Sequence, residues 1–235
     1  MLFHQLRDPV SSTYTYLLAD DGTGRAVLID PVIEHLEGYL ALIDELGVDL
    51  AYTLETHVHA DHVTAADALR TRLGCQTVIH HRSGAACADR FVRDGDVLPL
   101  GALSIEVRET PGHTDGCVSY VVGDRVFTGD ALLIGGCGRT DFQQGDAARL
   151  YDSVTGKLFT LPDETLVYPA HDYRGNTHST IGAERATNPR LGGGKTKAEF
   201  VEIMRALKLS PPAQMDRAVP ANQACGREAG APTGS

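Results

Sequence analysis

The side chains best suited to binding a metal ion are concentrated in residues 56–62. Within these seven residues lie three histidines and one aspartate: His57, His59, Asp61 and His62. Imidazole nitrogens bind zinc, iron, nickel and copper, and a neighbouring carboxylate also suits harder ions. The apolar-leaning run 50–54 comes directly before this segment, so we expect a β-strand to deliver it at its C-terminal end.

Three further segments place ligand-type side chains immediately after expected strands. Those side chains are His113, Asp130 and His171, and each follows small residues or proline. Such residues allow a tight turn at the end of a strand. Loops of this kind commonly carry catalytic groups while the sheet beneath them acts as a rigid platform. We therefore expect the four loops to meet in one metal-binding cleft.

The elements that must position these loops alternate between strands and helices. We expect strands over 13–18, 25–29, 50–54, 77–79, 103–108, 117–122, 125–128 and 165–168. We expect helices over 36–46, 64–73, 147–159 and 196–207. Strands mixed with helices in both halves favour an α/β (α+β) fold in which sheets and helices form layers. We expect one catalytic domain over 1–210, followed by a proline-containing, partly flexible C-terminal extension over 211–235.

The composition excludes several classes of function. The chain has 235 residues, 42% of them hydrophobic, which suits one large globular domain. Its formal net charge of -10 disfavours binding to nucleic acid or to an anionic membrane. No apolar run approaches the roughly 18 residues that span a bilayer, and the N-terminus does not resemble a signal peptide. Five cysteines without C-x-x-C spacing predict free thiols, and we expect a bacterial cytoplasmic protein.

The order H-x-H-x-D-H, then H, D and H, resembles the signature of the metallo-β-lactamase superfamily. The matching positions are His57, His59, Asp61, His62, His113, Asp130 and His171. This resemblance implies an αββα sandwich of two central mixed sheets flanked by helices, with the metal cleft at one edge. The seven positions alone do not choose a reaction. Hydrolases of the glyoxalase II type use the same set to hold two metal ions that activate a bridging hydroxide.

Stretches outside the ligand positions resemble the ETHE1-type persulfide dioxygenases. They are residues 8–16, 55–62, 128–134, 138–143, 168–173, 188–191 and 218–222. The resemblance implies a non-haem iron(II) dioxygenase that oxidises glutathione persulfide, with O2 and water, to sulfite and glutathione in sulfide detoxification. The alternative is a dinuclear thioester hydrolase of the glyoxalase II type, which should carry a longer helical region after His171. A non-enzymatic metal-binding scaffold is a third, disfavoured reading.

The resemblance also assigns roles to the ligand-type residues. It implies one iron(II) per chain, bound by His57, His113 and Asp130, with three coordination positions left open. The remaining four residues would support these ligands through hydrogen bonds, which is the role we favour. Alternatively, they would form a second metal position, as in hydrolases of the superfamily. These four residues are His59, Asp61, His62 and His171.

The implied substrate carries two carboxylates and an amine, so its pocket should offer hydrogen-bond donors. Arg139 is the best cationic candidate because a guanidinium can bind a carboxylate through two hydrogen bonds, although an ion pair with Asp141 is an alternative. Tyr173 and Thr114 are further candidates for substrate contact. Cys137 is either a redox-active thiol or a buried apolar residue. We expect glutathione persulfide and O2 as partners, a possible homodimer, and a separate chain for any rhodanese partner.

The remaining histidines carry weaker signals. His80 and His81 are adjacent, and neighbouring side chains on a strand point to opposite faces, so we do not expect them to bind one ion. We expect His4, His35 and His178 at the surface or in structural roles.

Overall fold

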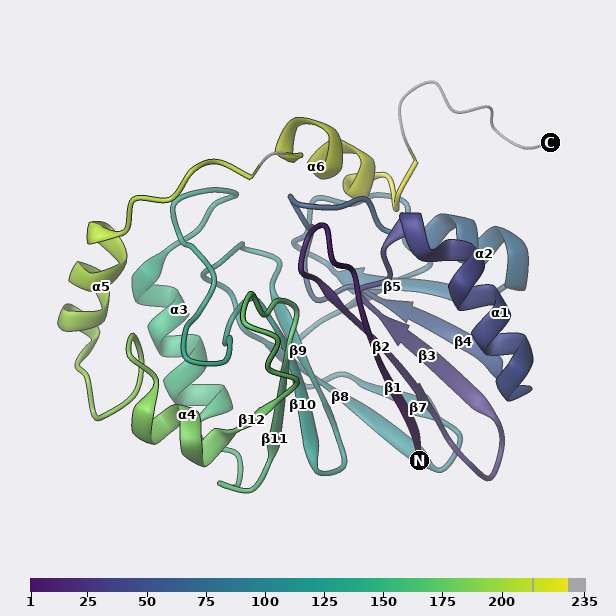
Figure 1. The fold of residues 1–235 in the computed structure, drawn as a ribbon, viewed down its shortest axis with the longest axis horizontal. Coiled ribbons are helices and arrows are strands. Elements are labelled where there is room, and N and C mark those ends of the chain that lie inside the picture. Colours follow the sequence, from purple (N-terminus) through teal and green to yellow (C-terminus); the bar gives the residue numbers. More distant parts are fainter. Residues whose placement is uncertain (213, 228–235) are drawn as a thin grey trace.

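Two mixed β-sheets of six strands each pack face to face, with helices on both outer faces (Figure 1). The computed structural model describes residues 1–212 and 214–227. The first sheet has the strand order β1-β2-β3-β4-β5-β6 and the second β12-β11-β10-β9-β8-β7. The predicted αββα sandwich is therefore confirmed.

The first sheet is antiparallel at one edge and parallel at the other. Its strands are β1 (Leu2–Arg7), β2 (Tyr14–Ala19), β3 (Arg25–Ile29), β4 (Asp49–Leu54), β5 (Gln76–His80) and β6 (Arg90–Val92). The helices α1 (Leu36–Leu46) and α2 (Ala66–Leu73) cover its outer face. They end where the sequence analysis expects, at Gly47 (φ 62°) and Gly74 (φ 71°), because glycine readily adopts the left-handed backbone that terminates a helix.

The second sheet is antiparallel except for the parallel pair β10 and β11. Its strands are β7 (Val97–Leu100), β8 (Leu103–Glu109), β9 (Val118–Val122), β10 (Arg125–Gly129), β11 (Leu166–Pro169) and β12 (Ser179–Thr180). The helices α3 (Ala147–Ser153), α4 (Ile181–Thr187) and α5 (Lys197–Ala206) cover this sheet, and a π-helical turn continues α3 over Val154–Leu158. Of these helices, the sequence did not predict α4.

The core between the sheets holds fully buried aromatic side chains, including Tyr16, Tyr120 and Phe127. The Tyr16 and Phe127 rings lie 4.9 Å apart. The Tyr16 hydroxyl donates to the Pro169 carbonyl at 2.6 Å, and the Tyr120 hydroxyl donates to the Glu55 carbonyl at 2.9 Å. Each hydroxyl thus has the partner that burial requires. Both carbonyls lie beside loops that carry ligand-type residues, so the core braces these loops directly.

The C-terminal region forms a helix that the sequence did not predict. The sequence predicts only a partly flexible extension over 211–235, but α6 (Met215–Gln223) is helical and lies at the top of Figure 1. Ala218 and Ala221 of this helix pack against Val63, which follows the histidine segment. The flexibility expected of the last residues concerns 228–235, which lie outside the described residues.

The prediction that all five cysteines are free thiols is wrong. Cys87 and Cys225 form a disulfide with a Cα–Cα distance of 5.9 Å, whereas Cys75, Cys117 and Cys137 are free and buried. The two bonded residues are separated by 138 positions, so only tertiary folding brings them together. The cysteines therefore give no support to the expected cytoplasmic location.

Candidate metal centre

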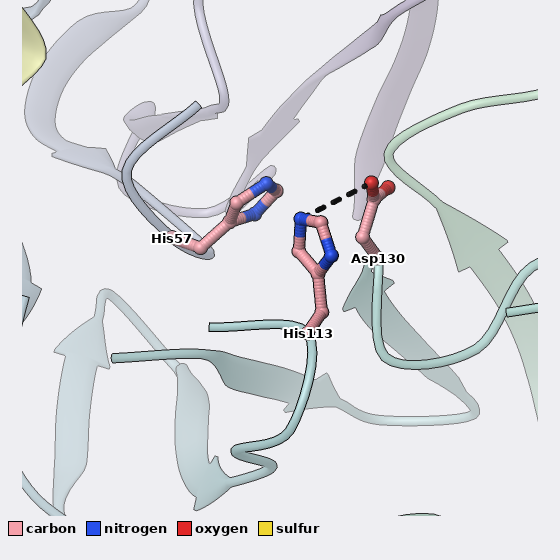
Figure 2. A group of neighbouring side chains, drawn as sticks. All are labelled: His57, His113 and Asp130. Atoms are coloured by element: carbon pink, nitrogen blue, oxygen red, sulfur yellow. Dashed lines mark ion pairs between the residues drawn. The ribbon is translucent and has the colours of Figure 1, made fainter. Parts of the chain in front are cut away.

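The loops after β4, β8 and β10 bring His57, His113 and Asp130 together (Figure 2). One potential ligand atom from each of the three side chains lies within 4.8 Å of the others. Of the three, His57 is buried, while the other two are partly exposed. The expected convergence of strand-end loops is confirmed for these residues, and their donor set of two imidazoles and one carboxylate suits a transition metal.

A buried chain of hydrogen bonds orients His57. The Thr56 hydroxyl donates to Asp30 Oδ2 at 2.8 Å and lies 3.0 Å from His57 Nδ1. Because the Thr56 hydroxyl uses its hydrogen in the bond to Asp30, its oxygen can act toward His57 only as an acceptor, and His57 Nδ1–H is the donor. This arrangement leaves the Nε2 lone pair of His57 free for an ion. Asp30 also accepts from the Thr56 amide at 2.7 Å, and its own backbone is left-handed (φ 51°).

The other two members of the centre are held in the same way. His113 Nδ1 lies 2.7 Å from the Arg139 carbonyl, which can only accept, so Nδ1 carries the proton. His113 Nε2 is then free and lies 3.6 Å from Asp130 Oδ2. Asp130 Oδ1 lies 2.7 Å from His171 Nδ1, which leaves Oδ2 for an ion. Each of the three side chains thus has one atom fixed by the protein and another facing the shared centre, which fits a bound metal.

The protonation states also suit metal binding. Burial, together with the neighbouring His59 and His113, holds the pKa of His57 well below its ordinary value, so its imidazole is neutral. Burial alone would raise the pKa of Asp130, but the charge and hydrogen bond of His171 hold that pKa far below its ordinary value. A neutral imidazole and an ionised carboxylate are the forms that bind a metal ion.

A second group of ligand-type atoms lies next to this centre. His59, Asp61 and His62 each offer an atom within 4.8 Å of the others. His171 Nε2 lies 3.0 Å from Asp61 Oδ2, so His171 connects this group to Asp130. His59 Nε2 lies 3.1 Å from Asp30 Oδ1, whereas among the described residues His62 Nε2 has no hydrogen-bond partner. This geometry suits the supporting role for His171, while His59, Asp61 and His62 also fit the alternative of a second metal position.

The metal centre opens into a cleft of about 520 Å³, which Arg139 and Tyr173 line. All three guanidinium nitrogens of Arg139 have partners within the chain: Asp141 at 2.7 and 2.8 Å, and the carbonyls of residues 209 and 210. The ion pair with Asp141, which the sequence analysis gave as the alternative role of Arg139, is therefore present in the structure. Tyr173 is 73% exposed and stacks parallel to His171. Thr114 is buried against Cys117 and does not line this cleft.

Two arginines of the cleft were not singled out from the sequence. Arg174 follows Tyr173 in the loop after β11, and Arg190 lies in the 188–191 segment. Arg190 donates to the Cys137 carbonyl at 2.7 Å, whereas within the described chain the Arg174 side chain makes no hydrogen bond or ion pair. The proximity of Arg174 to His171 in sequence was the signal that could have identified it.

Cys137 has the properties of a buried apolar residue. Its side chain is 2% exposed, and its sulfur lies 3.7 Å from that of Met204. Burial raises the pKa of the Cys137 thiol to about 11, so the reactive thiolate is scarce at neutral pH. These observations favour the core reading of Cys137 over the redox-active one.

The expectation that His80 and His81 point apart is wrong. Their ring centroids lie 4.4 Å apart, and Glu109 Oε1 lies 2.8 Å from His80 Nε2 and 3.5 Å from His81 Nε2. The reason is that β5 ends at His80, so the alternation of side chains along a strand does not extend to His81. Arg93 Nη1 lies 3.3 Å from His81 Nε2, which places a competing cation beside this cluster.

Comparison with known proteins places this geometry in a family. Residues 8–171 match the family model described as the metallo-beta-lactamase superfamily. The human mitochondrial persulfide dioxygenase ETHE1 is 54% identical over 229 residues, which cover 96% of this chain and 89% of that protein. The crystal structure of ETHE1 from Myxococcus xanthus superposes with a TM-score of 0.94 at 55% identity, covering 97% of this chain and all of that one.

A more distant structure contains two iron ions. The protein TTHA1623, solved in a di-iron-bound form, is 29% identical and superposes with a TM-score of 0.68 over 80% of this chain and 99% of its own.

Among the described residues, no helix is long and apolar enough to cross a membrane.

Proposed function

We propose that this chain, which belongs to the ETHE1 persulfide dioxygenases of the metallo-β-lactamase superfamily, oxidises glutathione persulfide at the His57–His113–Asp130 centre with one iron(II). The enzyme class and the oxidation of a persulfide follow from membership of this family. The metal, its ligands and the thiol part of the substrate are our proposal. The observation that supports it most is the set of two tautomer-fixed imidazoles and one ionised carboxylate that line one cleft.

The ligand set suits a non-haem iron oxygenase. Two imidazoles and a carboxylate on one side of an ion leave further coordination positions open. When bound, iron(II) would supply a redox-active centre for the reaction of persulfide with dioxygen. In the overall reaction the terminal sulfur leaves glutathione as sulfite, whose oxygens derive from O2 and water, and the glutathione sulfur takes up a proton. His171 holds Asp130 in place, and Thr56 and the Arg139 carbonyl hold the two imidazoles.

The cleft suits a substrate of the size of glutathione. Its volume of about 520 Å³ lies within the range of roughly 300–1,000 Å³ found for small-molecule sites. We propose that Tyr173 forms one wall and that Arg174 binds a substrate carboxylate, because its guanidinium has no partner within the described chain. Arg139 remains a proposed substrate contact, although its bonds to Asp141 must then be shared. Thr114 would act only through its neighbour His113.

Two assays on one iron-loaded preparation test the function. We expect oxygen uptake with glutathione persulfide and negligible thioester cleavage with S-lactoylglutathione. The variant His57→Ala should lose oxygen uptake together with bound iron, while Cys75→Ala, a buried change away from the cleft, should retain both. Thioester cleavage without oxygen uptake, in protein that binds two ions, would instead support the glyoxalase II type. The clustering of His59, Asp61 and His62 makes that alternative testable.

The partner and location assignments are part of this proposal. The separate rhodanese chain, the homodimer and the bacterial cytoplasmic location stay predictions. Sedimentation of the purified protein measures the oligomeric state directly.

A further inference from the structure

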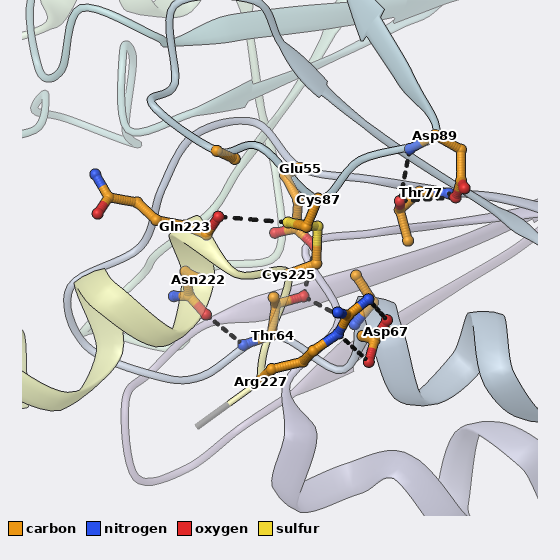
Figure 3. The surroundings of a disulfide bond; sticks show 12 residues. Glu55, Thr64, Asp67, Thr77, Cys87, Asp89, Asn222, Gln223, Cys225 and Arg227 are labelled. Atoms are coloured by element: carbon orange, nitrogen blue, oxygen red, sulfur yellow. Dashed lines mark hydrogen bonds and ion pairs between the residues drawn. A yellow bond between two sulfur atoms is a disulfide. The ribbon is translucent and has the colours of Figure 1, made fainter. Parts of the chain in front are cut away.

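A single buried amide joins the C-terminal helix to the histidine segment. Asn222 of α6 accepts a hydrogen bond from the Thr64 amide through Oδ1 at 2.8 Å (Figure 3). Its Nδ2 donates to the carbonyls of His59 at 2.9 Å and His62 at 2.8 Å. Asn222 is 5% exposed. One side chain of α6 therefore holds the backbone of residues 59–64, the loop that carries His59, Asp61 and His62.

Residues 224–227, which follow α6, are attached at three further points. The Cys225 carbonyl accepts from the Asp67 amide at 3.0 Å, and Arg227 forms an ion pair with Asp67. Gly226 passes so close to Thr64 that a Cβ atom would lie 2.1 Å from the Thr64 carbonyl oxygen. The third attachment is the disulfide from Cys225 to Cys87, which lies between β5 and β6 (Figure 3).

Only the disulfide among these attachments is covalent. The apolar contact of α6 is small, because its buried cluster consists of alanines against Val63 and Ile33. The Arg227 side chain is half exposed, and ion pairs at the surface contribute little to stability. The Cys87–Cys225 bond is therefore the attachment whose loss would most loosen this segment.

We propose that the Cys87–Cys225 disulfide holds the metal-binding loop in place through α6, and that its reduction weakens metal binding. When it is closed, α6 is fixed and Asn222 holds the backbone of residues 59–64. When thiols open it, α6 loosens, the bonds of Asn222 are lost part of the time, and the loop holds its metal less tightly. This proposal rests on the proposed metal centre but not on the identity of the substrate.

The opening reaction is thiol–disulfide exchange. A low-molecular-weight thiolate attacks Cys87, the more exposed of the two sulfur-bearing residues, and Cys225 leaves as a thiolate that takes up a proton. A second thiol then attacks the mixed disulfide and releases Cys87 as a thiol. Two small thiols are oxidised to one disulfide while the protein disulfide is reduced. Glutathione, the thiol released in the proposed reaction, belongs to this class.

The test compares oxidised and reduced protein with readouts that do not depend on turnover. Protein is equilibrated with oxidised glutathione or reduced with dithiothreitol, desalted anaerobically, and checked by peptide mapping for the 87–225 cross-link. Hydrogen exchange of residues 59–67 and 215–227 is then measured, together with iron(II) affinity in competition with a chromophoric chelator. We expect faster exchange in both segments and affinity lower by about 10-fold after reduction, at the low end of the loss seen for supporting groups of a metal site.

Three variants separate the parts of this proposal. Cys87→Ser should behave as reduced protein under all conditions, whereas Cys75→Ala keeps the disulfide and should keep the response to reductant. Asn222→Ala should weaken iron binding with the disulfide intact, and Asn222→Gln should restore part of the loss. The proposal is overturned if the cross-link does not form, or if exchange and affinity are equal in the two redox states. Failure of oxygen uptake alone would count against the proposed function and leave these readouts unchanged.

Discussion

Replacing Thr56 with valine removes one hydroxyl beneath the metal centre while keeping the shape of the side chain. Thr56 is 1% exposed, so no water replaces the lost group without a rearrangement. Its hydroxyl donates to Asp30 at 2.8 Å and accepts from His57 Nδ1–H at 3.0 Å. In Thr56→Val the imidazole loses the acceptor that fixes its tautomer, and the carboxylate loses one of its donors.

The size of the effect follows from these two bonds. A buried donor left without an acceptor costs about 1–3 kcal/mol. Loss of a group that orients a metal ligand costs about 10–100-fold in metal affinity, which corresponds to about 1.4–2.8 kcal/mol. We therefore expect Thr56→Val to fold, to be less stable than the unchanged protein by about 1–3 kcal/mol, and to bind iron(II) at least 10-fold more weakly.

Two measurements check this prediction. Urea unfolding of metal-free protein gives the stability, and anaerobic competition with a chromophoric chelator gives the iron affinity. The matched control is Thr56→Ser, which keeps the hydroxyl and lacks only the methyl group, so its iron affinity should stay close to that of the unchanged protein. The reasoning is refuted if Thr56→Val binds iron as tightly as the unchanged protein, or if serine loses as much affinity as valine.

Three other predictions concern Asp8, Gly129 and Arg174. Burial alone would raise the pKa of Asp8, but hydrogen bonds from Ser11 lower it to about 2, so Asp8 stabilises the fold above its ordinary pKa and this contribution is lost as the pH falls toward 2. Urea unfolding should thus show Asp8→Asn less stable by about 1–2 kcal/mol at pH 7, and this difference should shrink as the pH falls from about 4 toward 2. Gly129→Ala should destabilise the folded protein by about 2–4 kcal/mol and weaken iron binding. The reasons are the φ of 54° at this position and the new Cβ, which would lie 2.7 Å from Thr56 Oγ1. Equal unfolding midpoints for the variant and the unchanged protein would contradict this prediction. Arg174→Ala should raise the KM for glutathione persulfide about 10-fold with little change in kcat, and Arg174→Lys less; an unchanged KM would remove Arg174 from the substrate site.

Much of the fold was predictable because its signals are local. Apolar runs of strand length and helical spacing, with glycine stops such as Gly47 and Gly74, depend on residues that are near one another in sequence. The order of ligand-type residues after strands was equally visible, and the structure brings His57, His113 and Asp130 together as expected. The helix α6 was missed because its segment contains prolines and few large apolar residues.

The sequence by itself determined the superfamily, the layered fold and the residues able to bind a metal, since each is encoded in short segments of defined spacing. Only the tertiary structure decided which atom of each ligand is free. The tautomer of His57 depends on Thr56 and Asp30, and that of His113 on the Arg139 carbonyl. Hydrogen bonds and disulfides between distant residues leave no periodic trace in the chain. For that reason the bond of Cys87 to Cys225 and the hydrogen bonds of Asn222 to residues 59–64 could be found only in the folded protein.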